Sequence, residues 1–238
     1  MDYDLIIIGS GPGGYVAAIR ASQLKMKVAV IEKAEIGGIC LNWGCIPTKS
    51  LLKSARIFDY LNHAAEYGIA VSGEVKADFG AVIARSRSVA DGMSKGVQFL
   101  FRKNNITLIK GSGRLAGQNS VETVDADCNS KTLSAKNIIL ATGARSKELP
   151  NLKQDGKKII GYREAMTLPQ QPKSIVVVGS GAIGSEFANF YQSMGTEVTL
   201  VEFLPRIVPN EDEEVSKQLE RSFKKMKMKV MTDSSVES

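Results

Sequence analysis

The sequence predicts an α/β fold made of two similar units of alternating strands and helices, with the second unit cut short. A strand–turn–helix–strand pattern with a glycine-rich turn occupies residues 5–32 and recurs at residues 175–202. Strands that alternate with helices favour a parallel sheet covered by helices. Hydrophobic residues make up 43% of the 238 residues, which is enough for a buried core.

The first copy of the pattern begins with the apolar strand 5–8, which runs into the glycine-rich turn 9–14. A helix of small residues follows over 15–24, and a second apolar strand, 28–31, ends at Glu32.

The second copy repeats this order downstream. The strand 175–178 leads into the turn 179–184, a helix to about Met194 follows, and the strand 198–201 ends at Glu202. In both copies, 23 residues separate the first glycine from the terminal glutamate.

Glycines at this spacing have distinct tasks. The first makes the tight turn from strand to helix, the second lets a pyrophosphate approach the backbone, and the third lets helix and strand pack closely. The helix N-terminus offers free N–H groups to phosphates, and the acid accepts hydrogen bonds from a ribose. One such motif is weak evidence, but two in the same register predict two Rossmann-like dinucleotide-binding domains. Because no arginine follows Glu202 before Arg206, the second site favours NAD over NADP.

Between the two copies, Asp78 is predicted to cap a long helix that ends near Lys103 and carries an apolar stripe on one face. Four short strands are predicted after it, at residues 106–109, 113–116, 121–124 and 137–140.

A connection with three prolines, spread over residues 150–172, separates the two units. We expect residues 1–150 to form the first domain and residues 151–238 the second. The second begins a six-stranded fold, but after the repeated pattern it contains only a predicted helix over 212–228 and a strand over 229–232. We therefore expect this domain to be incomplete at its C-terminal end.

The net charge is +6, from 31 Lys and Arg against 25 Asp and Glu. The densest basic cluster has no interleaved arginine and aromatic residues, so we interpret it as a solvated helix face and expect no nucleic-acid partner; it consists of Lys224, Lys225, Lys227 and Lys229. The longest apolar run has five residues, so no membrane-spanning segment is predicted. The N-terminus lacks the basic region and cleavage site of a secretory signal, and we expect a cytoplasmic protein.

The chain has three cysteines. Cys128 stands alone in a predicted turn, whereas Cys40 and Cys45 are close enough to act together. In a regular helix, residues five apart are separated by about 7.5 Å of rise, but a disulfide requires Cα atoms within about 4.4–6.8 Å. The two cysteines can therefore bond only if the segment between them is distorted, which Asn42 and Gly44 tolerate.

Three interpretations of Cys40 and Cys45 compete. A zinc site would require further ligands, and with only Cys128 and the single histidine, His63, available, we expect no metal. An inert pair of thiols is the plain structural interpretation. A redox disulfide beside a bound cofactor fits best, because a helix N-terminus favours a thiolate and the first glycine motif supplies a cofactor site nearby.

Residues 37–49, GGICLNWGCIPTK, resemble the active-site signature of the pyridine nucleotide–disulfide oxidoreductases. Within that family they are most similar to the dihydrolipoamide dehydrogenases, in which Leu-Asn between the cysteines and Ile-Pro after them are usual. The resemblance covers the whole chain, since both glycine motifs and the Ala-Thr-Gly of residues 141–143 match in order. Three positions depart from the pattern: Ile39, Trp43 and Thr48 stand where Thr, Val and Ser are commoner.

The resemblance implies that the first domain binds FAD and the second binds NAD. The implied FAD contacts are spread over several segments: Gly9, Ser10, Gly11, Pro12, Gly13, Gly14, Glu32, Lys33, Gly38, Cys40, Lys49, Gly113, Ala141, Thr142, Gly143 and Ala144. The implied NAD contacts come from the second glycine motif, the helix after it and the following acid: Gly179, Gly181, Ile183, Gly184, Glu186 and Glu202.

The resemblance also implies roles for four side chains. Cys40 is the thiol that exchanges with the lipoyl sulfur, and Cys45 is the thiol that passes electrons to the flavin. Lys49 reaches the flavin ring, and Glu186 pairs with Lys49. For Lys49 and Glu186, an ordinary helix-face charge is the alternative interpretation.

The implied reaction is the ping-pong transfer of electrons from dihydrolipoamide to NAD⁺ through a Cys40–Cys45 disulfide and FAD. The implied partner is the lipoyl domain of a 2-oxoacid dehydrogenase or glycine cleavage complex, and the implied whole protein is a homodimer.

Family members continue into a dimer domain whose His–Glu dyad acts in the partner subunit's site. Because these residues are missing, we expect the 238-residue chain to be inactive alone, and we interpret His63 as a helix-surface histidine. Two alternatives remain open: another NAD(P)H–disulfide reductase, of the glutathione or mercuric type, and a non-catalytic nucleotide-binding module that senses redox state.

Overall fold

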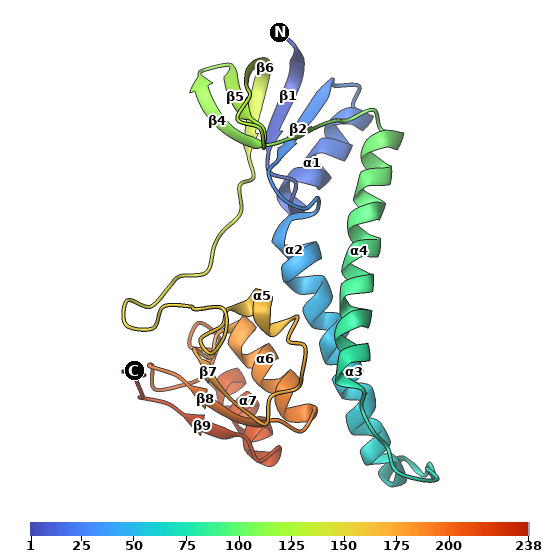
Figure 1. The fold of residues 1–238 in the computed structure, drawn as a ribbon, viewed down its shortest axis with the longest axis vertical. Coiled ribbons are helices and arrows are strands. Elements are labelled where there is room, and N and C mark those ends of the chain that lie inside the picture. Colours follow the sequence, from blue (N-terminus) through green and yellow to red (C-terminus); the bar gives the residue numbers. More distant parts are fainter. Residues whose placement is uncertain (238) are drawn as a thin grey trace. The chain divides into compact units, whose positions relative to one another are not determined.

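A computed structural model describes residues 1–237 and confirms the α/β class. Contacts divide the chain into two compact units, residues 1–47 with 87–145 and residues 48–86 with 146–238. Each unit contains its own sheet (Figure 1). The assignment of FAD to residues 1–150 and of NAD to the remainder stays a prediction.

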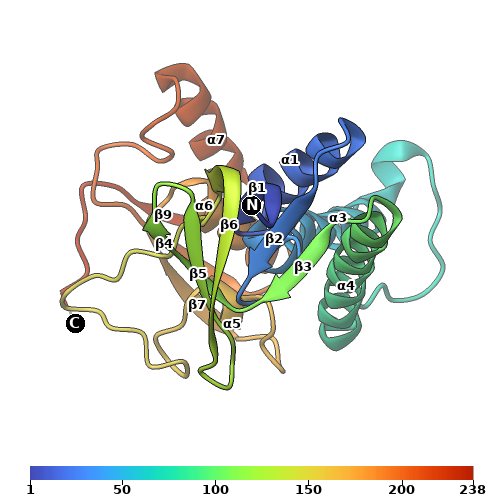
Figure 2. The same ribbon diagram turned by 90° about the horizontal axis from the view of Figure 1, so that it is seen from above.

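The first unit contains a six-stranded sheet in the order β3-β2-β1-β6-β5-β4. Its strands are β1 (Tyr3–Ile8), β2 (Val28–Glu32), β3 (Thr107–Lys110), β4 (Ser112–Gly117), β5 (Ser120–Val124) and β6 (Ser130–Leu140). β3, β2, β1 and the end of β6 pair in parallel, whereas β4, β5 and the start of β6 pair antiparallel. Figure 2 shows these strands side by side in this order.

Strand β6 is longer than the sequence predicted. The apolar run 137–140 indicates only its last part, which pairs with β1, whereas the first part pairs with β5. In that first part polar residues flank Leu133 and Ala135, which are buried on the sheet. Because this half of β6 alternates polar and buried residues, it lacks the continuous apolar run that the prediction depended on.

Both faces of β1 and β2, the central strands of the parallel part of this sheet, are buried. Alternate residues of β1 enter different core clusters, with Leu5 and Ile7 in one and Ile6 and Ile8 in the other. The first cluster also receives side chains from α1 (Pro12–Gln23). Burial on both faces explains why β1 is apolar throughout.

The second unit contains a parallel sheet of β7 (Ser174–Val178), β8 (Glu197–Val201) and β9 (Lys229–Met231), in that order. Its helices are α5 (Tyr162–Ala165), α6 (Ala182–Ser193) and α7 (Glu213–Lys225). The predicted strands and helices of the repeated pattern are confirmed to within a few residues.

Two long helices contribute to both units. They are α3 (Cys45–Asn62), followed by a 3-10 turn at Ala64–Tyr67, and α4 (Phe79–Lys103). In the second unit, Leu51 of α3 and Phe79 of α4 join the core cluster that contains Phe190 and Tyr191 of α6. The capping of α4 by Asp78 is confirmed, since Ala81 N–H donates to Asp78 Oδ1 at 2.9 Å. Among the helices of residues 1–237, none is long and apolar enough to cross a bilayer.

Candidate functional site

The first glycine turn joins β1 to α1 with almost no free space at its ends. Gly9 has a φ of 103°, and its N–H donates to Ile31 O at 2.8 Å. A Cβ at Gly9 would overlap the carbonyl oxygen of Ala141, and a Cβ at Gly14 would overlap that of Gly9. Close backbone packing therefore requires glycine at both positions.

Gly11, in the middle of the turn, has the opposite character. Its φ of −64° suits any residue, and within the described chain nothing lies within 4 Å of a Cβ placed there. Gly11 is the N-cap of α1, and Pro12 begins the helix without a side-chain cap. The N-terminus of α1 is therefore open to an anionic ligand at this point.

The second glycine turn, between β7 and α6, has the same geometry. Gly179 has a φ of 93° and donates to Val201 O at 2.8 Å, and a Cβ at Gly184 would overlap the Gly179 oxygen. Gly181 caps α6 with a φ of −59°, and no atom of residues 1–237 lies within 4 Å of its Cβ position. Ile183 is exposed in the first turn of α6. The two glycine turns therefore match in three-dimensional structure as well as in sequence.

The two acids are held in matching ways. Glu32 Oε2 accepts from Ser10 N at 2.8 Å and from Ser10 Oγ at 2.6 Å, while Oε1 accepts from Ala34 N at 2.9 Å. Glu202 makes the same three bonds, with Ser180 N, Ser180 Oγ and Leu204 N, at 2.8, 2.6 and 2.9 Å. Each carboxylate is thereby fixed beside its glycine turn and keeps lone pairs for a further donor.

Ser180 is the residue that sequence reasoning missed. It occupies in the second turn the position that Ser10 occupies in the first, so alignment of the two copies would have found it. Its hydroxyl also accepts from Val208 N at 3.1 Å, as the Ser10 hydroxyl accepts from Gly37 N at 3.2 Å. In both units, this serine connects the acid to the loop that follows it.

Glu202 is buried, and its environment favours the ionised form. Burial alone would raise its pKa, but the hydrogen bonds from Ser180, Leu204 and Phe203 outweigh that effect and lower the pKa below the ordinary value of 4.5. Glu202 is therefore a carboxylate at neutral pH.

Other residues predicted to contact FAD border the first turn. A Cβ at Gly38 would lie 2.8 Å from Gly11 Cα, one at Gly113 would lie 3.2 Å from Ile8 Cγ2, and Ala141 N donates to Ile8 O at 2.8 Å. Four further predicted contacts are exposed, Lys33 directly after Glu32 and the run Thr142, Gly143 and Ala144 directly after Ala141. Gly13 lies in the first turn of α1.

The two cysteines lie on either side of a break between two helices. Cys40 belongs to α2 (Gly38–Trp43) and Cys45 is the first residue of α3. Gly44 separates the helices with φ −143° and ψ −115°, and a Cβ at Gly44 would lie 3.4 Å from Cys40 Cα. The segment between the cysteines is thus distorted, as a disulfide would require, and the residue before Cys45 lies back against Cys40. In the structure, Cys40 is a half-buried thiol, and Cys45 and Cys128 are exposed thiols.

Lys49 and Glu186 form an ion pair between α3 and α6 within the second unit. The Lys49 side chain is 62% exposed and that of Glu186 is 30% exposed. The predicted contact is therefore present, while the role of Lys49 toward a flavin stays a prediction.

His63 follows α3 on the surface. Its Nδ1 lies 2.9 Å from Asp59 O, and the hydrogen bond to this oxygen, aided by the Asp59 charge, raises the pKa of His63. A surface histidine with a local partner fits the structural interpretation given above.

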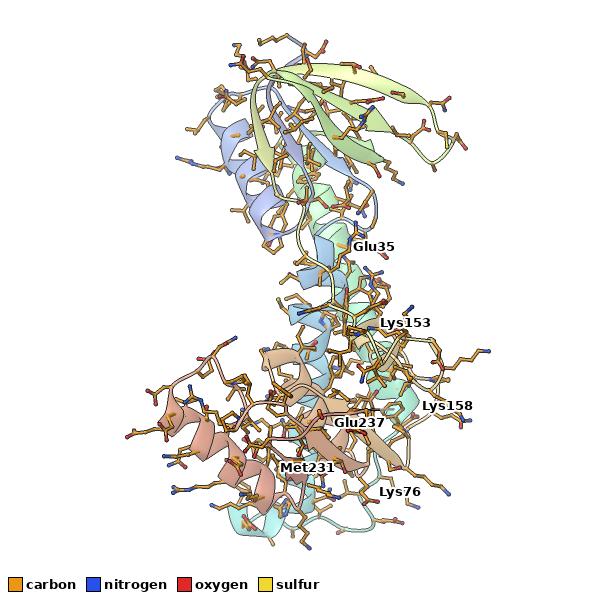
Figure 3. All side chains as sticks on the ribbon, turned by 90° about the vertical axis from the view of Figure 1, so that its left-hand side faces the viewer. Glu35, Lys76, Lys153, Lys158, Met231 and Glu237 are labelled. Carbon is orange, nitrogen blue, oxygen red and sulfur yellow. The ribbon has the colours of Figure 1, made fainter. Side chains whose placement is uncertain are left out.

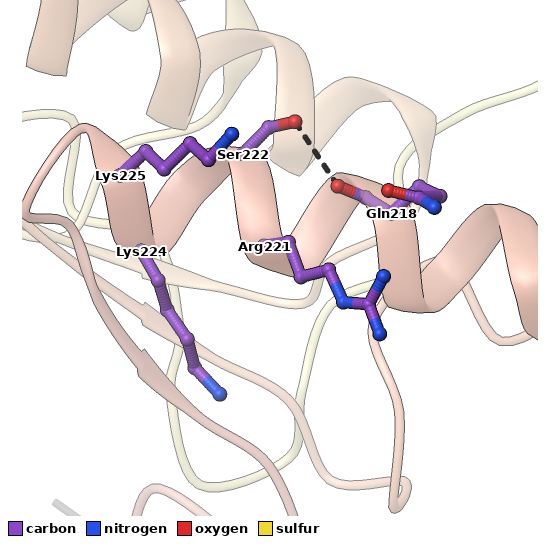
Figure 4. A pocket seen from close by; sticks show the side chains of 5 residues that line it. All are labelled: Gln218, Arg221, Ser222, Lys224 and Lys225. Atoms are coloured by element: carbon purple, nitrogen blue, oxygen red, sulfur yellow. Dashed lines mark hydrogen bonds between the residues drawn. The ribbon is translucent and has the colours of Figure 1, made fainter.

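The basic cluster near the C-terminus lies partly on α7, beside a shallow hollow of about 500 Å³. Figure 4 shows that Lys224 and Lys225 extend from the helix in different directions. It also shows the hydrogen bond that Ser222 Oγ donates to the backbone oxygen of Gln218. Lys224 also pairs with Glu220 at 2.6 Å. Lys224 and Lys225 therefore do not converge on a common point.

Comparisons with known proteins agree with this geometry. Residues 3–238 match the model of the pyridine nucleotide-disulphide oxidoreductase family. The dihydrolipoyl dehydrogenases of Zymomonas mobilis and Rhizobium etli are each 49% identical, over 99% and 98% of this chain and 50% and 52% of their own length. The crystal structure of LpdA from Mycobacterium tuberculosis matches with a TM-score of 0.88 and 28% identity, over 96% of this chain and 51% of that protein.

The chain spans about half the length of these relatives. Oxidoreductases of the matching family use FAD and NAD. A match from residue 3 to residue 238 establishes that the chain belongs to the pyridine nucleotide-disulphide oxidoreductase family.

Proposed function

We propose that this chain is part of a dihydrolipoyl dehydrogenase, which moves two electrons from dihydrolipoamide to NAD⁺ through a Cys40–Cys45 disulfide and FAD. The observation that carries the proposal is the direct connection between the first glycine turn and the cysteine segment. Gly37 N donates to Ser10 Oγ, and Gly38 packs on Gly11. A dinucleotide held at the turn would thus lie at the start of the helix that carries Cys40.

The first unit has features that fit FAD. The open N-terminus of α1 at Gly11 suits a pyrophosphate, and Glu32 is held where it can accept from a ribose hydroxyl. FAD, when bound, supplies a two-electron acceptor for thiols.

The second unit has features that fit NAD. Gly181 and Glu202 repeat the arrangement of Gly11 and Glu32. An acid at this position binds a ribose diol and disfavours a 2′-phosphate, whereas an arginine there would favour the phosphate. The nearby Arg206 donates instead to Pro209 O at 3.0 Å. We therefore propose NAD rather than NADP as the ligand.

The cysteines would perform the thiol chemistry. A thiolate of the dithiol attacks Cys40 Sγ of the disulfide and releases Cys45 as a thiolate; the second substrate thiolate then displaces Cys40, which closes the lipoamide disulfide. Two electrons and two protons have then passed from the substrate to the protein thiols. Cys45 is the first residue of α3 and so lies at the N-terminal end of that helix.

The whole protein would be a homodimer that receives its substrate from a lipoyl domain. Since the implied His–Glu dyad lies in a further domain and the only histidine of this sequence is the surface residue His63, we propose that the 238 residues do not turn over alone.

The thiol step is testable with the 238-residue chain. After oxidation with glutathione disulfide, removal of the oxidant and a mass measurement showing that no glutathione remains attached to the chain, dihydrolipoamide should make Cys40 and Cys45 accessible to an alkylating reagent, with one lipoamide formed per chain. Cys128 is alkylated throughout and serves as the internal control. Cys40→Ser should abolish lipoamide formation, whereas Cys128→Ser should not change it. Failure of dihydrolipoamide to reduce the oxidised wild-type chain would contradict the proposal.

Nucleotide titrations and turnover assays separate this function from its rivals. We expect NADH to bind more tightly than NADPH, and no NADH production from dihydrolipoamide with FAD and NAD⁺ present. Tighter binding of NADPH would favour a reductase of the glutathione or mercuric type. A reversible disulfide without FAD binding would favour a redox-sensing module, and NADH production would overturn the proposed inactivity of the chain alone.

A further inference from the structure

The segment that carries Cys40 is held against α4 by side-chain contacts that lie entirely in the first unit. Arg87 Nη1 donates to Asn42 O at 2.6 Å, and Ser94 Oγ donates to Ile36 O at 2.8 Å. Asn42 itself donates from Nδ2 to Ile36 O and Gly38 O, at 2.9 and 3.0 Å. The backbone before and after Cys40 is thus fixed at several points.

Arg87 occupies the end of α2 at which the chain turns toward Cys45. Asn42 is the penultimate residue of α2, so its carbonyl is one of those left without a partner inside the helix. A cation that donates to such a carbonyl also interacts favourably with the negative end of the helix. Arg87 therefore caps α2 two residues before the break at Gly44.

Trp43 links Arg87 to the segment before α2. The Arg87 guanidinium lies over the Trp43 ring, 4.2 Å from its centroid, and Trp43 Nε1 donates to Glu35 Oε1 at 3.2 Å. Figure 3 labels Glu35 on the segment between β2 and α2. A cation over an indole face is attracted by the ring, more strongly when both are partly buried, as here. Arg87, Trp43 and Glu35 thus connect the two ends of α2.

We propose that Arg87 is a positioning residue for the Cys40–Cys45 couple: by capping α2 and stacking on Trp43, it holds the bend at Gly44 in the form that brings the two sulfurs together. The inference rests on the proposed redox role of these cysteines. A loop held in its closed form loses less chain entropy when the disulfide forms, so the two thiols have a higher effective concentration. Loosening the loop should therefore make the disulfide easier to reduce.

Arg85 provides a matched control on the same helix. It donates to Ser50 Oγ at 2.7 Å and to Ser50 O at 3.1 Å, so it also joins α4 to α3, but these bonds do not reach α2 or the residues between the cysteines. A general loosening of α4 should affect Arg85 and Arg87 variants alike, whereas positioning of the cysteines depends on Arg87.

The test is the equilibrium of the 238-residue chain in buffers of reduced and oxidised glutathione. Each disulfide forms as two protein thiols lose two electrons and two protons to glutathione disulfide, which becomes two glutathione molecules. The disulfide fraction is measured by alkylation and mass spectrometry, and the single tryptophan, Trp43, reports the state of the segment by fluorescence.

We expect Arg87→Ala to lower the equilibrium constant for disulfide formation at least about threefold and to change Trp43 emission, with Arg85→Ala equal to wild type. Arg87→Lys keeps a cation that can donate, so its equilibrium constant for disulfide formation should fall between those of wild type and Arg87→Ala. If Arg87→Ala does not fold, Arg87→Lys is the variant that tests the inference. An Arg87 variant equal to wild type, or an equal shift in Arg85→Ala, would overturn the inference while leaving the proposed function intact. A wild-type chain that forms no Cys40–Cys45 disulfide would instead refute the proposed function.

Discussion

Gly13 and Gly14 are neighbours in α1 with different surroundings. A Cβ at Gly14 would overlap the Gly9 carbonyl oxygen, whereas one at Gly13 would meet Ala141 Cβ at an ordinary 3.9 Å. We expect Gly14→Ala to lower the free energy of unfolding by about 1–3 kcal/mol because helix and strand must separate. Gly13→Ala should leave it unchanged or raise it by up to about 1 kcal/mol, because alanine favours a helix. Urea unfolding measures the free energy of unfolding of both variants. Equal losses in the two variants would show that Gly14 is not required by close packing on Gly9.

The Glu202 carboxylate makes stability depend on pH. Its pKa in the folded state is lower than the ordinary 4.5, so its contribution is complete well above that value and is lost as the pH falls through the folded pKa. We expect Glu202→Gln to be less stable than wild type at pH 7, with the difference shrinking below about pH 4.5.

Urea midpoints at pH 7 and at low pH measure this difference. Glu197→Gln, at the exposed start of β8, should lie within about 0.5 kcal/mol of wild type at pH 7. A Glu202→Gln deficit that stays constant with pH would show that ionisation of this group does not stabilise the fold.

Helix α7 begins with a side-chain cap. Asp212 Oδ1 accepts from Glu214 N at 2.8 Å. Asp212→Ala should cost about 1 kcal/mol of stability, and Asp212→Asn, which keeps an acceptor, should cost much less. Thermal unfolding followed by circular dichroism distinguishes the two variants, and an alanine variant as stable as the asparagine variant would exclude a capping role.

Elements with local signals were predictable from the sequence. The glycine turns and α4 follow from glycine spacing, a capping residue and apolar periodicity, which depend on neighbours in the chain. The first half of β6 was not predictable from the sequence, because its pairing with β5 decides its conformation. Its exposed lysines also interrupt the apolar pattern around the two buried side chains. The break between α2 and α3 was expected only on condition that the cysteines bond, and the structure places it at Gly44.

For the molecule as a whole, the candidate site was predictable where residues repeat or cluster in sequence. Glu32 and Glu202 were found because their distance from the glycine motif is the same in both copies. Arg87 was not found from the sequence, because it approaches Asn42 from a separate helix, 45 residues further along the chain. Nothing in its local sequence distinguishes it from Arg85, and only the tertiary structure shows which arginine contacts the cysteine segment.

We propose that each glycine turn is a separate dinucleotide site, and calorimetric titration of FAD and NADH into two variants is the decisive test. An added methyl group at Gly11 or Gly181 meets no atom of residues 1–237, so either substitution leaves the turn intact but obstructs a pyrophosphate. Gly11→Ala should weaken FAD binding about tenfold or more, or about 1.4 kcal/mol, and leave NADH binding unchanged, while Gly181→Ala should do the reverse. If neither substitution weakened its own ligand, or one weakened both equally, the claim of two separate sites would be wrong.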